Sequence, residues 1–228
     1  MSSSSKRPGR DRPRAPLSRE RVLRAAVALA DERGLAALSM RKLAGELDVE
    51  AMSLYNHVKS KDDLLDGMID IVFSEIEPPA AGGDWKAELR KRALSTREAL
   101  RRHRWAVGEM EGRTDHGLAN LRLHDAVLGC LRAAGFSVEM TVHAYSMQDA
   151  YIYGFCLQET DMASQTPEDF AAEARRQMSA YEDALADFPH LLEVVGGHVA
   201  KVGYDYDTEF LFGLDAILER LEQLLHER

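Results

Sequence analysis

Side chains that could contact nucleic acid are concentrated between residues 39 and 61 of this 228-residue chain. They combine positive charges, hydrogen-bonding groups, small apolar groups and aromatic rings: Arg41, Lys42, Ala51, Met52, Ser53, Tyr55, Asn56, His57 and Lys61. In the major groove of DNA, base edges present acceptors, donors and methyl groups, while the phosphates attract positive charge. Residues of these types on an exposed face would therefore suit the reading of double-stranded DNA.

Two short helices joined by a tight turn would build such a face. Ser39 is a candidate N-cap of the first helix, and the second helix follows a turn at residues 48–50. Apolar residues three or four positions apart form the expected buried side of the pair: Leu43, Ala44, Leu47, Leu54 and Val58. Ser60 and Asp63 then look like a capping box at the start of a further helix. Its free amides, with Lys61 in the first turn, would favour a phosphate.

Longer helices are expected on both sides of this pair. One is predicted from Ser18 to Arg33, because Ser18 can cap it and Gly34 can stop it. The other is predicted from Lys61 to about Glu77, where two prolines end it. Together with the short pair, these helices would form an N-terminal unit with its own core.

The composition divides the chain into three parts. Residues 1–16 are predicted to be a disordered basic arm, and residues 17–77 a helix-turn-helix domain with its connecting helix. The stretch 78–83, rich in proline and glycine, is the expected boundary, after which residues 84–228 form a second domain. Residues 1–61 hold 13 lysines and arginines against 7 acidic residues, whereas the remainder holds 16 against 31. The formal net charge of −9 therefore conceals an electropositive end, as DNA binding requires.

Residues 39–65 resemble the N-terminal domain of TetR-type (TetR/AcrR) transcriptional regulators; they read SMRKLAGELDVEAMSLYNHVKSKDDLL. The resemblance covers roughly residues 17–75, and its most specific signal is the run Leu54-Tyr55-x-His57-Val58-x-x-Lys61. Asp48 stands where the family usually has a glycine in the turn. Because aspartate tolerates the left-handed conformation better than most residues, we expect the turn to form.

The resemblance implies a role for the exposed residues of this segment. Arg41 would contact a base or a phosphate, Ala51, Met52, Ser53 and Asn56 would face base edges, and Tyr55, His57 and Lys61 would anchor phosphates. Two of these residues have a structural alternative: His57 could cap a helix or be partly buried, and the ring of Tyr55 could belong mostly to the core. The operator sequence does not follow from these residues.

The rest of the chain is predicted to be helical throughout, because no alternating strand pattern competes with the helical periodicity. Expected helices span residues 84–103, 105–111, 116–134, 138–162, 167–187, 189–202 and 207–227. The predicted fold class is therefore all-α. A three-helix helix-turn-helix domain would be followed by a larger helical domain for ligand binding and dimerisation.

Two of these helices carry apolar stripes that could serve a second partner. In the last helix, steps of three and four residues connect Phe210, Leu214, Ile217, Leu221 and Leu224, with Leu211, Leu218 and Leu225 beside them. In helix 138–162 the same steps connect Val138, Val142, Tyr145, Asp149, Ile152 and Cys156. TetR-type proteins dimerise through a four-helix bundle, so the resemblance and the periodicity together predict a homodimer through the 138–162 and 207–227 helices. The alternative is that the last helix packs only within its own chain.

The resemblance also implies that the larger domain binds a small-molecule inducer, which releases the protein from its operator. Aromatic, thioether and imidazole groups lie along helices that would converge inside a bundle: Trp105, Met110, Leu121, His124, His143, Met147, Tyr151 and Phe155. Each of them could equally be ordinary core. Arg92, Glu109 and Arg113 are candidate polar contacts, with surface charge as the alternative.

Residues 85–159 resemble the tetracycline-repressor type of C-terminal domain but depart from it at ligand positions. Glu77 and Glu109 stand where tetracycline-responsive members have histidines. Arg92 and Thr96 stand where those members have an amide and an aromatic ring, and both are candidate ligand contacts here. Tetracycline is therefore not the expected inducer. No compact spacing of histidines predicts a metal site, and no cofactor is expected.

Several other classes of protein are disfavoured. No apolar run approaches the roughly 18 residues of a membrane span, and the first residues lack the apolar core of a secretion signal, so a cytoplasmic protein without membrane association is expected. Cys130 and Cys156 are expected to be buried, reduced thiols. No phosphate-binding glycine loop, nucleophile elbow or metal cluster predicts an enzyme. The main alternative is an all-α small-molecule-binding adaptor without sequence-specific DNA binding, which the basic first quarter disfavours.

Overall fold

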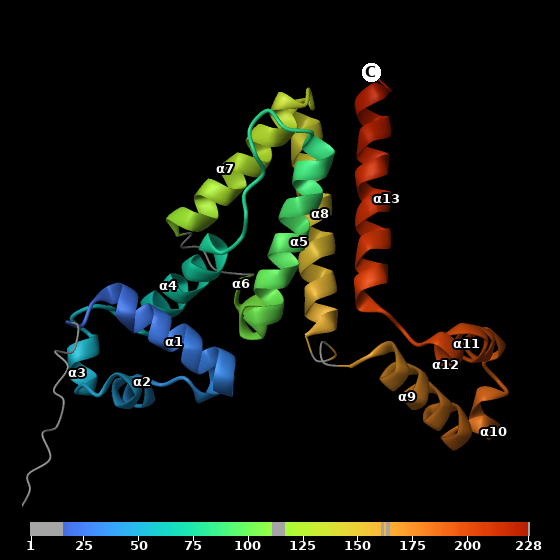
Figure 1. Ribbon diagram of the computed structural model, residues 1–228, viewed down its shortest axis with the longest axis horizontal. Coiled ribbons are helices and arrows are strands. Elements are labelled where there is room, and N and C mark those ends of the chain that lie inside the picture. The colour runs from blue at the N-terminus through green and yellow to red at the C-terminus, as the bar shows by residue number, and fades with distance from the viewer. Residues whose placement is uncertain (1–15, 111–116, 161, 163–164, 228) are drawn as a thin grey trace, which may run out of the picture.

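The computed structural model describes residues 16–110, 117–160, 162 and 165–227, and all regular secondary structure in these residues is helical (Figure 1). The predicted all-α class is confirmed. The helices build two hydrophobic cores, one among the N-terminal helices and one among the long helices that follow. None of the described helices is both long and apolar enough to cross a bilayer. Most of the predicted basic arm, residues 1–15, lies outside the described residues.

Four helices build the N-terminal core. Their bounds are α1 Arg19–Arg33, α2 Met40–Leu47, α3 Ala51–Leu54 and α4 Lys61–Ser74, with a 3-10 turn at Leu35–Ala37. Three serines begin these helices as predicted. The hydroxyls of Ser18, Ser39 and Ser60 each accept a hydrogen bond from the backbone N–H three residues later. The core beneath them completely buries Leu43, Leu54, Leu64 and Met68.

The turn between α2 and α3 takes the left-handed conformation. Asp48 has φ 53° and ψ 53°, and among the described residues it is the only non-glycine with a positive φ. The N–H of Val49 donates to the carbonyl of Ala44 at 3.0 Å, which closes the end of α2. The predicted turn is confirmed. The second helix is shorter than predicted, because α3 ends at Leu54 and residues 55–57 continue as hydrogen-bonded turns.

The second core lies among long helices (Figure 1). Their bounds are α5 Trp85–Arg102, α7 Leu118–Ala133, α8 Val138–Glu159 and α13 Tyr206–His226, and a 3-10 turn at Arg104–Ala106 leads into the short helix α6 Val107–Met110. Helix α4 belongs to both cores, because Leu64 and Met68 pack in the first and Val72 and Phe73 in the second. It therefore connects the segment predicted to contact DNA directly with the larger core.

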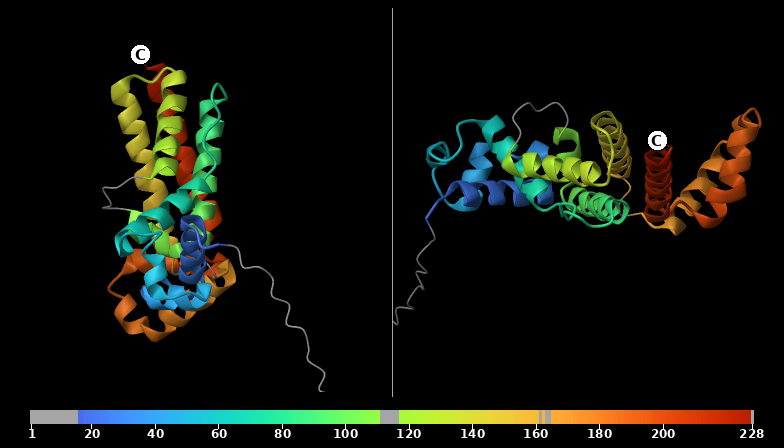
Figure 2. Two further views of the ribbon diagram at one scale, coloured as in Figure 1. Left: turned by 90° about the vertical axis from the view of Figure 1, so that its left-hand side faces the viewer. Right: turned by 90° about the horizontal axis from the view of Figure 1, so that it is seen from above.

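Residues 165–204 form a group of short helices on the side of the long helices away from α1 to α3 (Figures 1 and 2). Their bounds are α9 Pro167–Ala180, α10 Glu182–Leu185, α11 Pro189–Val194 and α12 Ala200–Val202, with a π-helical turn at Val195–Val199. The two continuous helices predicted at 167–187 and 189–202 are thus each interrupted. Gly196 and Gly197 lie inside the π-helical turn, where their low helix propensity weakens regular α-helix.

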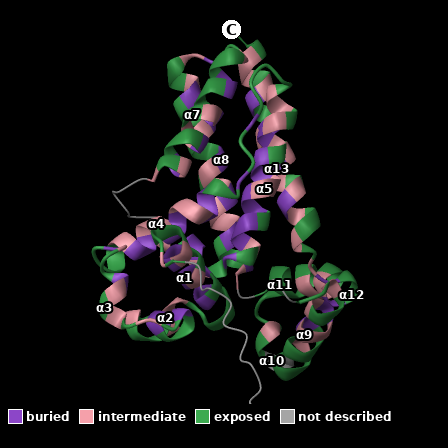
Figure 3. Ribbon diagram, turned by 60° about the vertical axis from the view of Figure 1, so that its left-hand side comes forward, coloured by how far each residue is buried: buried purple, intermediate pink, exposed green. Residues whose placement is uncertain are grey.

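Buried, partly buried and exposed residues are mixed along α8 (Figure 3). The apolar stripe predicted on helix 138–162 is not the buried face of this helix. Ile152 and Cys156 are buried in the chain's own core, whereas Val138 and Val142 are 69% and 55% exposed. The buried face runs instead through Thr141, Ala144, Gln148, Ile152, Cys156 and Glu159. Because half of these residues are polar, an apolar pattern could not reveal this face. The predicted stripe lies along the edge of this buried face, and the chain's own core covers only some of the residues of the stripe.

The stripe on the last helix packs within the chain. Phe210, Leu214, Leu218 and Leu221 are buried against the second core. Leu211, Ile217, Leu224 and Leu225 of the same stripe are only partly buried, so the chain's own core covers one side of it. Other residues of α13 stay exposed, above all Phe212 at 75%.

Candidate DNA-binding and ligand-binding sites

The residues predicted to contact DNA lie at one end of the molecule, on α2, α3, the turns that follow and the start of α4 (Figure 1). Most are exposed: Arg41, Lys42, Met52, Tyr55, Asn56 and Lys61. Ala51, Ser53 and His57 are partly buried. Met52 is 74% exposed, so a thioether on this surface is available to a partner. The segment presents charge, amide, hydroxyl and apolar groups of the kinds that base edges and phosphates accept.

A buried polar cluster lies between α5 and α8. The Arg92 side chain is fully buried, and its Nη2 lies 2.8 Å from Oδ1 of Asp149. That distance is typical of an ion pair, yet none of the three guanidinium nitrogens has a well-aligned hydrogen-bond acceptor among the described residues. Burial disfavours the charged guanidinium, but the Asp149 carboxylate outweighs burial and the pKa of Arg92 is raised. Thr96, one turn along α5, donates its hydroxyl to the Arg92 carbonyl at 2.8 Å.

Two further polar residues of α8 are buried near Asp149 in the sequence, Gln148 directly before it and Tyr153 four residues after it, and Tyr153 interacts electrostatically with both Arg92 and Asp149. Both amide atoms of Gln148 and the hydroxyl of Tyr153 are buried with no hydrogen-bond partner in the described part of the chain. Burial raises the pKa of Tyr145 and of Tyr153 well above the ordinary value, so both phenols are neutral donors at pH 7. An unpaired buried polar group costs about 1–3 kcal/mol. The cluster would therefore gain stability from a bound molecule that supplies the missing partners.

A series of ring contacts connects this cluster with α4. The imidazole of His124 on α7 lies edge-on to the ring of Tyr145, with centroids 5.3 Å apart. Phe73 of α4 meets the same imidazole edge-on at 6.4 Å. Tyr145 in turn contacts Asp149, the ion-pair partner of Arg92. The structure thus brings together three of the residues considered for ligand binding, Arg92, Thr96 and His124, next to residues that sequence did not assign to a ligand.

A second connection joins α1, α4 and α5 around His103. Its Nδ1 lies 2.8 Å from Oδ1 of Asp31, and its Nε2 lies 3.1 Å from Oε2 of Glu75. The indole N–H of Trp105 donates to the same Asp31 oxygen at 2.7 Å, and Arg102 donates to the same Glu75 oxygen at 2.7 Å. Burial raises the pKa of Glu75, but the hydrogen bonds from His103 and Arg102 outweigh it and lower that pKa. Trp105, considered as a ligand contact, thus donates a hydrogen bond to Asp31 of α1 in the N-terminal core.

Three residues proposed from sequence as ligand contacts do not point into the bundle. Leu121 is 49% exposed, Met147 is 41% exposed, and His143 is exposed as well. The expectation that they converge inside is therefore wrong. On α8 the inward side runs through Ala144 and Gln148, which places positions 143 and 147 outside.

The other predicted ligand residues are found in different settings. The hydroxyl of Tyr151 lies within hydrogen-bond distance of the carbonyls of Glu209 and Phe210, and its ring stacks on Phe210. Met110 packs against the second core, with Glu109 partly buried beside it on α6. Arg113 lies outside the described residues.

A buried ion pair that was not predicted joins α5, α8 and α13. Arg97 donates to both carboxylate oxygens of Glu159, at 2.8 and 2.7 Å, and lies 2.8 Å from Asp207. Its guanidinium also lies over the Phe210 ring, 4.8 Å from the centroid. Unlike Arg92, this arginine has well-aligned partners. Its role is the packing of the three helices.

The two cysteines are free and buried, as predicted. Burial raises the pKa of Cys156 to about 12 and also raises the pKa of Cys130. Both thiols are therefore protonated at neutral pH. Within the described ranges, no three or more His, Cys, Asp or Glu side chains are grouped as a metal site would require.

Known proteins resemble this chain over most of its length. Residues 22–68 match the family "Bacterial regulatory proteins, tetR family", and residues 77–225 match "Tetracyclin repressor-like, C-terminal domain". The chain is 35% identical over 236 residues to the HTH-type transcriptional repressor DrrR1 of Streptomyces coeruleorubidus, covering 99% of this chain and 84% of that protein. It is 30% identical over 215 residues to the class D tetracycline repressor protein of Escherichia coli, covering 91% and 90%.

Solved structures share the fold. ActR of Streptomyces coelicolor in complex with actinorhodin superimposes with a TM-score of 0.76 at 28% identity, covering 92% of this chain and 99% of that one. A TetR variant of Acinetobacter baumannii in complex with minocycline gives a TM-score of 0.65 at 26% identity, with the same coverage. A helix-turn-helix on a larger all-helical domain defines a DNA-binding transcriptional regulator. The chain belongs to the TetR family, whose members generally act as regulators rather than enzymes, and the predicted resemblance is confirmed.

Proposed function

We propose that this chain is a homodimeric repressor that binds a palindromic operator and leaves it when a small molecule occupies the cluster around Arg92. The observation that carries this proposal is the cluster itself. Arg92, Gln148 and Tyr153 bury hydrogen-bonding groups without well-aligned partners among the described residues. Well-packed apolar residues would be at least as stable there, so a ligand that satisfies these groups explains their presence.

Operator reading is assigned to the two copies of the helix-turn-helix in a dimer. Their recognition segments would enter successive major grooves about 34–36 Å apart. Arg41 and Lys42 from α2, base-facing Ala51, Met52, Ser53 and Asn56, and phosphate-holding Tyr55, His57 and Lys61 make up the proposed contacts. Most of these side chains are exposed, which supports the assignment.

The groups around Arg92 favour an aromatic inducer rich in oxygen. A buried guanidinium is a strong donor to carbonyl, phenolate or carboxylate oxygens. The amide of Gln148 can both donate and accept, while Tyr145, Tyr153 and His124 offer rings that stack on a planar molecule. ActR in complex with actinorhodin and the Acinetobacter TetR variant in complex with minocycline share this fold, which supports the binding of a small molecule here.

The ligand would act on DNA binding through α4. A molecule that displaces Tyr145 or Asp149 also disturbs His124 and, through it, Phe73 on α4. A second contact, His103 with Asp31 and Glu75, links α5 to the DNA-binding helices. Release requires that ligand and operator prefer different arrangements of these helices.

We assign dimerisation to the outer faces of α8 and α13. Between Val142 and Gln158, the exposed residues of α8 include no Asp, Glu, Lys or Arg. Ala150 and Gly154 in the middle of this face would allow a second helix to approach closely. On α13, Phe212 is 75% exposed. An uncharged face of this length beside an exposed aromatic ring is typical of a protein interface.

In this proposal the protein works by binding rather than catalysis. It requires no cofactor and acts in the cytoplasm, where a bacterial operator lies. The predicted domain division at residues 78–83 is kept, because α4 ends just before it and α5 begins just after it.

The test is selection of bound sequences from a random double-stranded DNA pool with purified full-length protein, repeated at two salt concentrations. A palindromic motif of about 14–20 base pairs, bound less tightly at higher salt, is expected of a dimeric reader. Weak, indiscriminate binding with no motif would instead favour the adaptor alternative.

A further inference from the structure

We infer that Arg19 and Asp63 are positioning residues, which hold the backbone of the DNA-contacting segment 55–61 in place. The inference rests on the proposed phosphate contacts of Tyr55, His57 and Lys61. Neither Arg19 nor Asp63 needs to touch DNA in this role.

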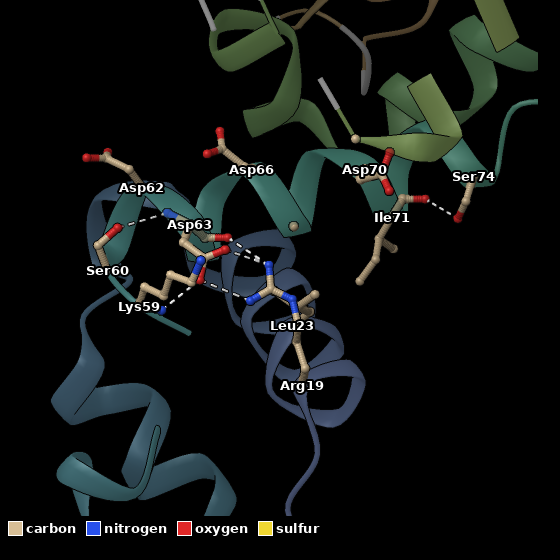
Figure 4. A pocket seen from close by; sticks show the side chains of 12 residues that line it. Arg19, Leu23, Lys59, Ser60, Asp62, Asp63, Asp66, Asp70, Ile71 and Ser74 are labelled. Atoms are coloured by element: carbon tan, nitrogen blue, oxygen red, sulfur yellow. Dashed lines mark hydrogen bonds and ion pairs between the residues drawn. The ribbon is translucent and has the colours of Figure 1, made fainter. Parts of the chain in front are cut away.

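The two side chains hold each other and the segment between them (Figure 4). Nη2 of Arg19, at the start of α1, donates to Oδ1 of Asp63 at 2.6 Å, and Nη1 donates to Oδ2 at 3.0 Å. The same Nη1 donates to the backbone carbonyl of His57 at 2.9 Å. Oδ2 of Asp63 also accepts the backbone N–H of Lys59 at 2.6 Å. The pair therefore fixes one peptide group on each side of Val58.

This segment needs such support because it lies between two helices. α3 ends at Leu54 and α4 begins at Lys61, so the residues between them lack regular helical hydrogen bonds. Phosphate positions on DNA are fixed, and a contact forms only if the backbone that carries the side chain is held accurately. Besides its turn hydrogen bonds and the buried Val58, the segment is held by Arg19 and Asp63.

The surroundings of Arg19 argue against a direct phosphate contact. The cleft between α1 and α4 is also lined by the carboxylates Asp62, Asp66 and Asp70 (Figure 4). These negative charges repel a phosphate, and the arginine is already occupied by a bidentate pair. The hydrogen bond from Arg19 lowers the pKa of Asp63, in keeping with a firm pair at neutral pH.

Asp63→Asn separates positioning from simple electrostatics by the sign of its effect. Loss of a negative charge near DNA would tighten binding if charge alone mattered. If Asp63 positions the backbone, the variant should bind the selected operator roughly tenfold more weakly, the effect of losing charge-assisted hydrogen bonds. Asp62→Asn is the matched control: it makes the same charge change one residue away, at an exposed side chain.

Two further measurements distinguish misplaced phosphate-binding groups from a smaller amount of folded protein. In a salt titration, the slope of log affinity against log salt should fall by about 1 for each phosphate that the variant no longer binds. A merely destabilised variant keeps the wild-type slope. Hydrogen exchange at the Lys59 amide should become faster in Asp63→Asn and stay unchanged in Asp62→Asn. Because exchange needs no DNA, it tests the hold on the backbone even if the operator proposal fails.

Arg19→Lys provides the test if Asp63→Asn does not fold. Lysine keeps the charge but cannot form the bidentate pair and reach the His57 carbonyl together. Weaker operator binding, by roughly threefold or more, is expected. The inference is overturned if Asp63→Asn and Asp62→Asn have the same operator affinity and the same Lys59 exchange.

Discussion

At the scale of single residues, the proposed ligand response depends most on Arg92. A charged group in the core is tolerated only with compensation, and Asp149 supplies the opposite charge at 2.8 Å. Because the guanidinium nitrogens have no well-aligned acceptor among the described residues, they can still donate hydrogen bonds to a ligand. Removing one partner of such a pair costs far more than removing both, because it leaves the other charge buried and alone.

We predict that Arg92→Leu alone destabilises the protein by about 3–5 kcal/mol, whereas Arg92→Leu combined with Asp149→Leu is close to neutral. Urea unfolding of the wild type, both single variants and the double variant measures this directly. A double variant whose cost equals the sum of the two single costs would mean that the two charges do not depend on each other.

A second prediction at this scale concerns pH. The pKa of Asp63 is lowered, chiefly by its hydrogen bond from Arg19 and against the effect of burial. Because the folded pKa lies below the unfolded one of about 4, the pair's stabilisation is complete above that pH and is lost as pH falls through the folded pKa. Urea midpoints should therefore differ most between wild type and Asp63→Asn at neutral pH. A difference that grows on acidification would contradict this.

At the scale of elements, the contact between α4 and α7 joins the two cores. A carboxylate oxygen of Asp70 accepts the backbone N–H groups of Ala119 and Asn120, at 2.9 and 3.2 Å. An acidic side chain at the start of a helix also interacts favourably with its dipole. Gly117 makes room for this contact, because a Cβ there would lie 2.1 Å from Cγ of Asp70.

Gly117→Ala should therefore push α7 away from α4 and destabilise the protein by about 1–3 kcal/mol. Gly129→Ala, within α7, is the control, since nothing lies within 4 Å of a Cβ at that position. There the better helix propensity of alanine should stabilise by about 0.5–1 kcal/mol. Opposite signs in chemical denaturation are expected, and two variants of equal stability would show that Gly117 has no special role.

Elements set by near neighbours could be predicted from the sequence. Ser18, Ser39 and Ser60 cap helices as expected, and Asp48 takes the left-handed turn, because each depends on only a few residues around it. Residues 54–61 also carry enough family-specific detail to indicate DNA reading. The fold class and the DNA-binding segment could therefore be predicted from the sequence.

The ligand cluster could be predicted only in part from the sequence, because its contacts join residues far apart in the chain. Arg92 was a candidate, but its pairing with Asp149 depends on how α5 and α8 pack. Gln148 lies on the buried face of α8, where a polar residue leaves no mark in a hydrophobic pattern. His143 and Met147 were misplaced for the same reason: the pattern did not show which side of α8 faces inward.

At the scale of the whole molecule, positive charge is concentrated in the N-terminal part and negative charge in the rest. This distribution directs DNA to one end, within the screening distance of about 8–10 Å at ordinary salt. To bind a palindromic site, two such N-terminal units must be held at a fixed distance and orientation. The dimer proposed through α8 and α13 would hold them in this way.

Ala150→Glu places a charge in the uncharged outer face of α8 and should produce monomers in sedimentation velocity experiments. Operator affinity should fall by about 100-fold or more, because the two half-sites no longer bind as one unit. Leu121→Glu, at an exposed site on α7, is the control and should remain dimeric. A dimeric Ala150→Glu protein would place the interface elsewhere.

A molecule bound at the Arg92 cluster should lower the affinity of the protein for its operator. The most direct measurement starts with a thermal-shift screen of oxygen-rich aromatic compounds, including actinorhodin and minocycline. Operator Kd is then determined with and without a compound that binds, for the wild type and for the double variant Arg92→Leu, Asp149→Leu. We predict an operator Kd at least about tenfold higher with the compound in the wild type, and no change in the double variant. A compound that binds the wild type without changing its operator Kd, or that releases both proteins equally, would contradict this coupling.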